Sequence, residues 1–122
     1  MFRGFICTLA VAPLACAALA PAAADALEQL DRLSLASADP DQGLALARQQ
    51  AASGALLDAL ATLERTIAGH PKTKRALLLH ASILCRIDDR VGGEVEFARL
   101  KAKDFSKAEW AEARTPCEGA GQ

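Results

Sequence analysis

Beyond residue 24 of this 122-residue chain, four His and Cys side chains could bind a metal or act as nucleophiles: His70, His80, Cys85 and Cys117. Zinc sites place two ligands two to four residues apart so that one turn presents both, and no pair here has that spacing. On a helix, His80 and Cys85 point about 140° apart around the axis. The spacing therefore predicts no metal site and no Cys/His nucleophile pair. It leaves the two cysteines as either a disulfide or two free buried thiols.

The other polar clusters are explained by local structure rather than by catalysis. Gly92-Gly93 follows no predicted strand, so it does not form a phosphate-binding loop. The carboxylate pairs Asp88-Asp89 and Asp39/Asp41 fall at expected turns, where carboxylates stabilise helix N-termini. We therefore expect no enzymatic activity and no cofactor. The 14 Lys and Arg residues against 15 Asp and Glu give a net charge of −1, which argues against nucleic acid as a partner.

Residues 1–24 have the composition of a secretory signal peptide. One positive charge, Arg3, precedes an uncharged apolar run that ends in small residues at Ala22–Ala24. A retained membrane anchor and a lipidated Cys16 are the alternatives. Pro13 argues against both, because it disfavours a spanning helix and occupies the position where lipidation requires an aliphatic residue. We expect cleavage after Ala24, a periplasmic or secreted product, and no membrane insertion afterwards.

Apolar residues recur at helical spacing through the rest of the chain, and no stretch alternates with the period of a strand. Leu56, Leu60, Leu63 and Ile67 lie at i, i+4, i+7 and i+11, which places one apolar stripe on a helix. Capping residues, glycines and prolines separate such stretches. The pattern predicts an all-α chain with helices over residues 25–35, 40–52, 55–68, 74–87, 91–102 and 106–114, the last one ending at Thr115-Pro116.

The helical pattern also repeats along the chain. Three pairs of residues stand 34 positions apart and match in size, namely Ala47 with Ala81, Ala59 with Gly93, and Leu63 with Phe97. Small residues recur where two helices must approach closely, and large ones recur where a core must be filled. The residues predicted to pack in this way are Ala47, Ala59, Leu63, Ala81, Gly93 and Phe97.

On these residues, together with Gly54 at a turn and Pro71 at the end of a unit, the chain resembles the tetratricopeptide repeat (TPR) family. The full units span about 40–73 and 74–107. The sequence departs from the family pattern at four positions, where the family has leucine, proline or large aromatic residues; they are His80, Phe105, Gly43 and Gln50. The alternative is an ordinary helical bundle in which an alanine-rich sequence imitates a repeat.

The resemblance implies a short right-handed stack of antiparallel helical hairpins, a TPR-like α-solenoid, with an orphan helix at each end. The helical domain would span residues 25–117, followed by a disordered tail at 118–122. First helices of successive units run parallel in such a stack, which makes Cys85 and Cys117 neighbours. Export and the even number of remaining cysteines favour the same disulfide. It would hold the last helix in a stack with fewer than the three or so units usually needed.

The resemblance further implies a concave surface that binds a peptide or helix of another protein. Its arginines would suit an acidic segment or a carboxylate. We therefore expect an exported adaptor for another envelope protein; the alternative is a structural subunit or stabilising collar of a larger envelope or secretion assembly. The residues predicted to line this surface are Asp41, Leu44, Arg48, Arg75, Leu78, Ser82 and Arg86.

Overall fold

The computed structural model describes residues 20–119, so most of the predicted signal peptide and the last three residues of the predicted tail lie outside the described residues. The described part is all-α. It contains six α-helices and one short 3-10 helix, namely α1 (Ala20–Ala38), α2 (Pro40–Ala52), α3 (Leu56–Gly69), α4 (Lys74–Arg86), α5 (Arg90–Arg99), η1 (Ala102–Asp104) and α6 (Lys107–Glu118).

Capping side chains begin three of these helices at the predicted places. The Asp39 carboxylate accepts hydrogen bonds from the backbone N–H groups of Asp41 and Gln42, and Pro40 occupies the first turn of α2. The Asp89 side chain accepts from the N–H of Gly92 at the start of α5. Ser106 and Glu109 bond each other's backbone in a capping box at the start of α6. The φ angle of +84° at Gly54 allows the tight turn between α2 and α3.

Three predicted helices have different bounds in the structure. The helix predicted over 25–35 begins earlier and ends later, since α1 spans Ala20–Ala38. The helix predicted over 91–102 ends at Arg99, because Leu100 takes an extended conformation before the 3-10 turn. The last helix continues through Pro116 to Glu118 and is not ended by Thr115-Pro116. Pro116 lies close to the end of α6, so its missing N–H costs only one hydrogen bond. The disulfide of the next residue, Cys117, holds this last turn against α4.

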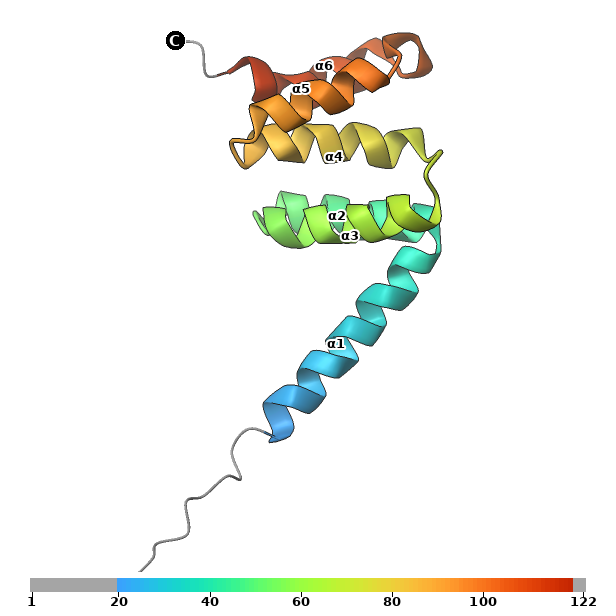
Figure 1. The fold of residues 1–122 in the computed structure, drawn as a ribbon, viewed down its shortest axis with the longest axis vertical. Coiled ribbons are helices and arrows are strands. Elements are labelled where there is room, and N and C mark those ends of the chain that lie inside the picture. Colours follow the sequence, from blue (N-terminus) through green and yellow to red (C-terminus); the bar gives the residue numbers. More distant parts are fainter. Residues whose placement is uncertain (1–19, 120–122) are drawn as a thin grey trace, which may run out of the picture.

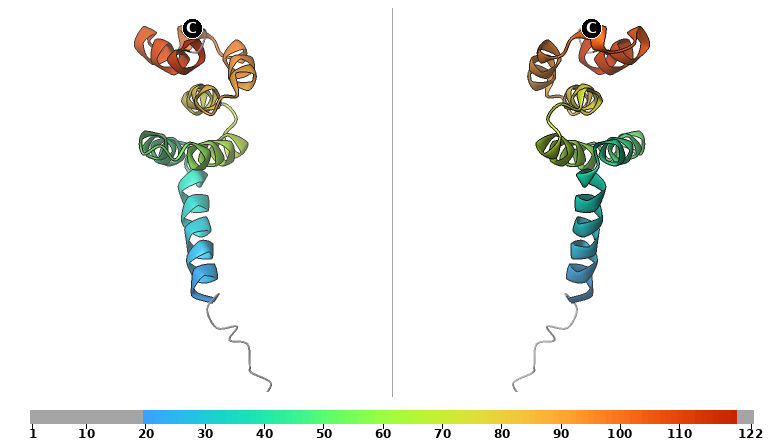
Figure 2. Two further views of the ribbon diagram at one scale, coloured as in Figure 1. Left: turned by 90° about the vertical axis from the view of Figure 1, so that its left-hand side faces the viewer. Right: turned by 90° about the vertical axis from the view of Figure 1, so that its right-hand side faces the viewer.

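Figure 1 shows the helices arranged in layers. α2 and α3 pack against each other as neighbours joined by a short turn, and α4 packs in the same way with α5. α3 contacts α4 between these pairs, and α6 covers the other side of α4. α1 contacts α2 and α3 near its C-terminal end and extends away from the other helices along the long axis of the molecule (Figure 2).

Two hydrophobic clusters fill the space between the helices. The first joins α2, α3 and α4 and contains Leu44, Ala47, Leu63 and Ile83. The second joins α4, α5 and α6, and its largest side chain is Phe97, which is 2% exposed. The six residues predicted to pack are all buried. A side chain at Gly93 would collide with the sulfur of Cys85 and the Ala81 carbonyl, so this close contact of α5 with α4 needs glycine.

The predicted disulfide between Cys85 and Cys117 is present, with the two Cα atoms 5.0 Å apart. It joins the C-terminal ends of α4 and α6. Near the N-terminal ends of the same two helices, an Arg75 nitrogen lies 3.5 Å from a carboxylate oxygen of Glu109. The two helices therefore run parallel, and each of their ends is tied to the other helix.

Candidate functional site

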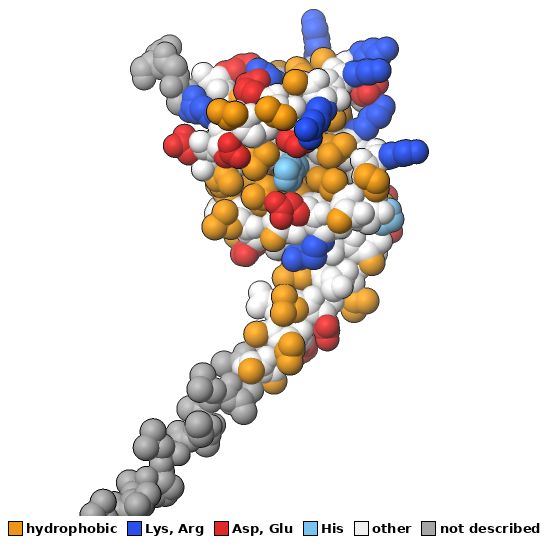
Figure 3. Space-filling view, viewed as in Figure 1, with side chains coloured by type: hydrophobic (Ala, Val, Ile, Leu, Met, Phe, Trp, Pro, Cys, Tyr) orange, Lys and Arg blue, Asp and Glu red, His pale blue; other side chains and the backbone are white. Residues whose placement is uncertain are grey.

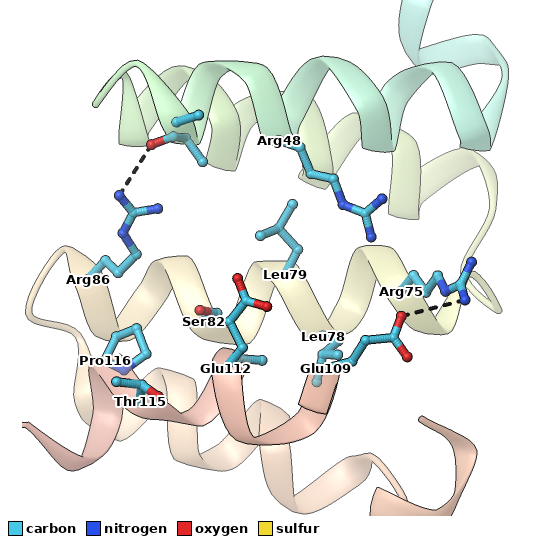
Figure 4. Close-up of a pocket in the computed structure, with 13 residues that line it drawn as sticks. Arg48, Arg75, Leu78, Leu79, Ser82, Arg86, Glu109, Glu112, Thr115 and Pro116 are labelled. Carbon is cyan, nitrogen blue, oxygen red and sulfur yellow. Dashed lines mark hydrogen bonds and ion pairs between the residues drawn. The ribbon is translucent and has the colours of Figure 1, made fainter. Parts of the chain in front are cut away.

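A groove with a volume of about 590 Å³ lies between α2, α4 and α6. Its size falls within the range of protein sites that bind small ligands or short peptide segments. Apolar and charged side chains share the surface (Figure 4). The lining residues are Arg48, Ala51 and Ala52 from α2; Arg75, Leu78, Leu79, Ser82 and Arg86 from α4; and Glu109, Glu112, Ala113, Thr115 and Pro116 from α6.

The helical repeat explains why the α4 residues share one face. Arg75, Leu78, Ser82 and Arg86 follow one another at intervals of three or four residues, so they form a continuous row along α4. Leu78 and Ser82 are 6% and 7% exposed and form part of the floor. The two arginines at the ends of the row are exposed. The structure thus brings together all four residues that the sequence analysis selected on this helix.

The α2 residues behave differently, since only Arg48 of the three predicted residues lines the groove. Leu44 is 5% exposed and belongs to the first hydrophobic cluster, because packing against α3 draws this large apolar side chain into the core. Asp41 is exposed in the first turn of α2, where a carboxylate is favoured by the N-terminal end of the helix dipole, and it lies outside the groove. The predicted placement of Asp41 and Leu44 is therefore wrong.

Sequence reasoning missed the third wall, which α6 supplies. Glu109 and Glu112 enter the groove from α6, across from Arg48 of α2, and Glu109 lies beside Arg75 in Figure 4. These two glutamates were not among the predicted lining residues, and they add acidic groups to a groove for which three arginines were predicted. The repeat contained the signal: one further step of about 34 residues from Arg75, Leu78 and Ser82 leads to Glu109, Glu112 and Pro116.

The charged groups of the groove differ in how firmly they are held. Arg86 donates a hydrogen bond to the Ala51 carbonyl across the groove at 3.2 Å, and Arg75 pairs with Glu109. Hydrogen bonds from the Ser106 backbone and hydroxyl, followed by the charges of Arg75 and Arg48, lower the pKa of Glu109 below its ordinary value of 4.5.

Arg48 is the groove cation that remains available for an incoming group. In the part of the chain that the structure describes, no hydrogen bond or ion pair holds its guanidinium, which points into the groove in Figure 4. A guanidinium of this kind can bind a carboxylate through two N–H groups. The groove therefore offers apolar contact along its floor and carboxylate recognition by Arg48 on its α2 side.

The two histidines lie outside the groove. The Nε2 atom of His70 is 2.9 Å from the Ala38 carbonyl, so it links the end of α3 to the end of α1. The Nε2 atom of His80 lies 4.0 Å from a carboxylate oxygen of Glu64. Among residues 20–119, no three His, Cys, Asp or Glu side chains gather in a way that could hold a metal ion.

Comparison of the chain with protein-family models, with curated proteins and with solved structures gave no match in any of the three cases. Across the described residues, no helix combines the length and the apolar character needed to cross a membrane. The geometry of the groove is therefore the main guide to function.

Proposed function

We propose that this protein is an exported adaptor that binds a peptide or helix of another envelope protein in the groove between α2, α4 and α6. The observation that carries this proposal is the combination of an apolar floor with an arginine, Arg48, that no described group pairs. A groove of this kind is a common form of protein recognition site. The proposal includes no catalytic step and no cofactor.

The proposal treats the chain as a TPR-like stack. The pairs α2/α3 and α4/α5, followed by α6, have the order expected for two hairpins and an orphan final helix. The groove is lined by α2, α4 and α6, the helices that would come first in each unit. In helical repeat proteins these helices present side chains to extended partners. α1 would then be the orphan second helix at the other end.

Export to the periplasm or beyond the cell belongs to the same proposal. The signal-peptide pattern of residues 1–24 supports it, and so does the disulfide between Cys85 and Cys117, since disulfides form and persist mainly in oxidising compartments. A partner in the same compartment would bind the groove of the chain in which the disulfide has formed.

The groove chemistry defines the partner segment. Apolar side chains of the segment would contact Leu78, Leu79 and Ala113. A carboxylate on one side of the segment would pair with Arg48. Its other side would meet Glu109 and Glu112, which disfavour a second acidic row. We therefore expect a segment that is apolar along one face and acidic along one edge.

Affinity capture from the native envelope tests the proposal, with bound proteins identified by mass spectrometry. The double variant Arg48→Glu/Arg75→Glu reverses charge inside the groove and should lose the captured partner. Arg99→Glu, on the exposed side of α5, makes the same type of change outside the groove and should retain the partner. Equal capture by the groove variant and the wild-type chain would show that the groove is not the binding surface.

A permanent structural subunit or collar of an envelope assembly is the second candidate. It is favoured by the large apolar side chains left exposed, among them Leu27 at 64%, Leu57 at 70% and Val91 at 79%. A subunit should be poorly folded when purified alone. An adaptor should be soluble and cooperatively folded on its own, so thermal unfolding followed by circular dichroism separates the two candidates.

A further inference from the structure

We infer that the groove accepts α1 of a second copy of this chain, so that two copies exchange these helices reciprocally. This inference rests on the proposed function, because it uses the same groove and names one occupant for it. The arm is defined as residues 23–32, the part of α1 that extends beyond α2 and α3. Figure 3 shows exposed hydrophobic side chains along this part of the molecule.

The arm has an apolar face that nothing in the described chain covers. Leu27 and Leu30 are 64% and 56% exposed and lie three residues apart, which places them on the same side of the helix. Closer to the body, the same helix is docked, since Leu33 is half-buried and Ser37 is only 6% exposed. The arm therefore presents two leucines that need a hydrophobic partner surface.

The charges of the arm match the two sides of the groove. With 100° between successive residues, Asp31 flanks the leucine pair on one side, and uncharged Ala26 and Gln29 flank it on the other. Glu28 lies beyond Asp31 and is paired with Arg32 of the same helix, so Asp31 is the carboxylate that the arm presents. The groove has arginines on its α2 and α4 sides and glutamates on its α6 side. One orientation thus places the Asp31 carboxylate near the arginines and keeps it away from the glutamates.

The occupant must come from another copy. α1 is anchored at its C-terminal end to α2 and α3 and runs along the long axis, whereas the groove lies between α2, α4 and α6 (Figures 1 and 2). The arm therefore points away from the groove of its own chain. A two-fold arrangement lets each arm enter the groove of the other copy, and it closes on itself, so that it does not build a filament.

The direct test is sedimentation analysis of the purified chain over a concentration series that extends into the high micromolar range. The N-terminus is left to the host and read by mass spectrometry, because cleavage after Ala24 would retain both leucines. We expect a reversible dimer. Leu27→Asp/Leu30→Asp should raise the dissociation constant of the dimer about 100-fold or more, since two buried leucines are lost. Leu57→Asp, an equally exposed leucine on α3, should leave it unchanged.

A second set of variants shows which surfaces meet. Arg48→Glu and Asp31→Arg should each weaken the dimer about tenfold, and the combined variant should restore part of the affinity. If Arg48→Glu leaves the dimer unchanged while the leucine variants abolish it, the arms pair with each other and the inference is wrong. Circular dichroism and the fluorescence of Trp110 verify that each variant is folded.

A chain that stays monomeric at every concentration also overturns the inference. That result leaves the proposed function intact if the envelope capture still depends on Arg48 and Arg75. Conversely, a dimer with the expected variant pattern and no captured envelope protein would assign the groove to self-association and contradict the adaptor proposal. The two proposals can therefore be refuted independently of each other.

Discussion

The two end helices, α1 and α6, both flank the central helices, but they are held in very different ways. α6 is tied to α4 by the disulfide at Cys117 and to α5 by two hydrogen bonds, of 2.9 and 3.1 Å, from Arg114 to Glu94. Trp110 of α6 lies against Phe97 with ring centroids 5.5 Å apart. α1 has none of these contacts. A hydrogen bond between His70 and the Ala38 carbonyl links its C-terminal end to the turn after α3.

The difference teaches how a short helical chain protects its ends. A helix at the end of such an arrangement packs against other helices on one side only, and its outer face stays uncovered. α6 meets this problem with covalent, ionic and aromatic contacts and with a polar outer face. α1 meets it only along its last turns, so its leucines remain exposed. We therefore expect the two ends to respond differently to substitution.

Phe97→Ala should produce the largest effect. Phe97 is 2% exposed, touches Trp110 and lies under the guanidinium of Arg114 at 4.9 Å. Removal of such a ring leaves a cavity and should lower the free energy of unfolding by about 3–5 kcal/mol. Leu30→Ala on α1 is the matched control and should change it by less than about 0.5 kcal/mol in the monomer. Urea denaturation followed by circular dichroism measures both values, and similar losses would contradict the comparison.

Removal of the disulfide should have the next largest effect. Cys85 and Cys117 stand 32 residues apart, and a cross-link that closes a loop of this length stabilises by about 3–4 kcal/mol in the chain-entropy model. Cys85→Ala/Cys117→Ala, and separately the wild-type chain in a dithiol reductant, should lose this amount. Trp110 is the only tryptophan and lies in α6, so its fluorescence reports on this end alone.

Hydrogen exchange locates the same effect. Loss of the disulfide should accelerate exchange of α6 amides and leave the amides of α2 and α3 protected until global unfolding. If α6 stays protected after reduction, its ion pairs and aromatic contacts are sufficient, and the disulfide is not what distinguishes it from α1.

The sequence predicted the elements better than the surfaces they form. Helix starts were predictable because Asp39 and Ser106 act locally, through hydrogen bonds to residues two or three positions away. The pairing of Cys85 with Cys117 followed from the repeat and is present. The end of α6 was not predictable, because a distant contact, the disulfide, holds the turn that contains Pro116.

The groove shows the same limit. A helical row identified Arg75, Leu78, Ser82 and Arg86 because all four lie on one helix. The prediction that Leu44 lines the groove was wrong because the burial of a side chain depends on how far its helix is rotated toward a neighbour. Sequence spacing alone does not determine this rotation. The α6 wall was missed because residues 106–114 were treated only as an end helix, so the step of 34 residues was not carried on from Arg75 and Leu78 to this helix.

Loss of the α6 capping box should have a smaller effect than loss of the disulfide. Ser106→Ala removes the acceptor for the Glu109 N–H and should lower stability by about 1 kcal/mol. The same box and the arginines lower the pKa of Glu109, so the ionised carboxylate is favoured in the folded state. Its stabilising contribution is complete above the ordinary value of 4.5 and disappears as the pH falls through the lower folded value.

The pH dependence of unfolding tests this linkage. Wild-type stability should decrease below about pH 4.5 more steeply than that of Ser106→Ala, in which Glu109 has lost its hydrogen bond from the serine hydroxyl. The pKa of Asp104 is also lowered, mainly by the hydrogen bond that its carboxylate accepts from Lys74. Lys74→Met removes this bond and is the control that isolates the contribution of Asp104. Ser106→Ala keeps the bond from the backbone N–H of residue 106 to the Glu109 carboxylate, so identical pH profiles for Ser106→Ala and the wild type would rule out a contribution of the serine hydroxyl to the lowered pKa of Glu109.

The smallest predicted effect concerns the single bond that holds the end of α1. His70 lies in the turn after α3, and its Nε2–H donates to the Ala38 carbonyl, which would otherwise lack a partner at the end of its helix. His70→Ala should cost about 0.5–1.5 kcal/mol in the docking of α1 and little in global stability. Hydrogen exchange should accelerate in α1 only, whereas Lys72→Ala, in the same turn, should leave it unchanged. Several contacts hold α6, whereas this single hydrogen bond holds the end of α1. Loss of one bond should therefore accelerate hydrogen exchange at α1 but be compensated at α6. Unchanged α1 exchange in His70→Ala would mean that side-chain packing alone docks this helix.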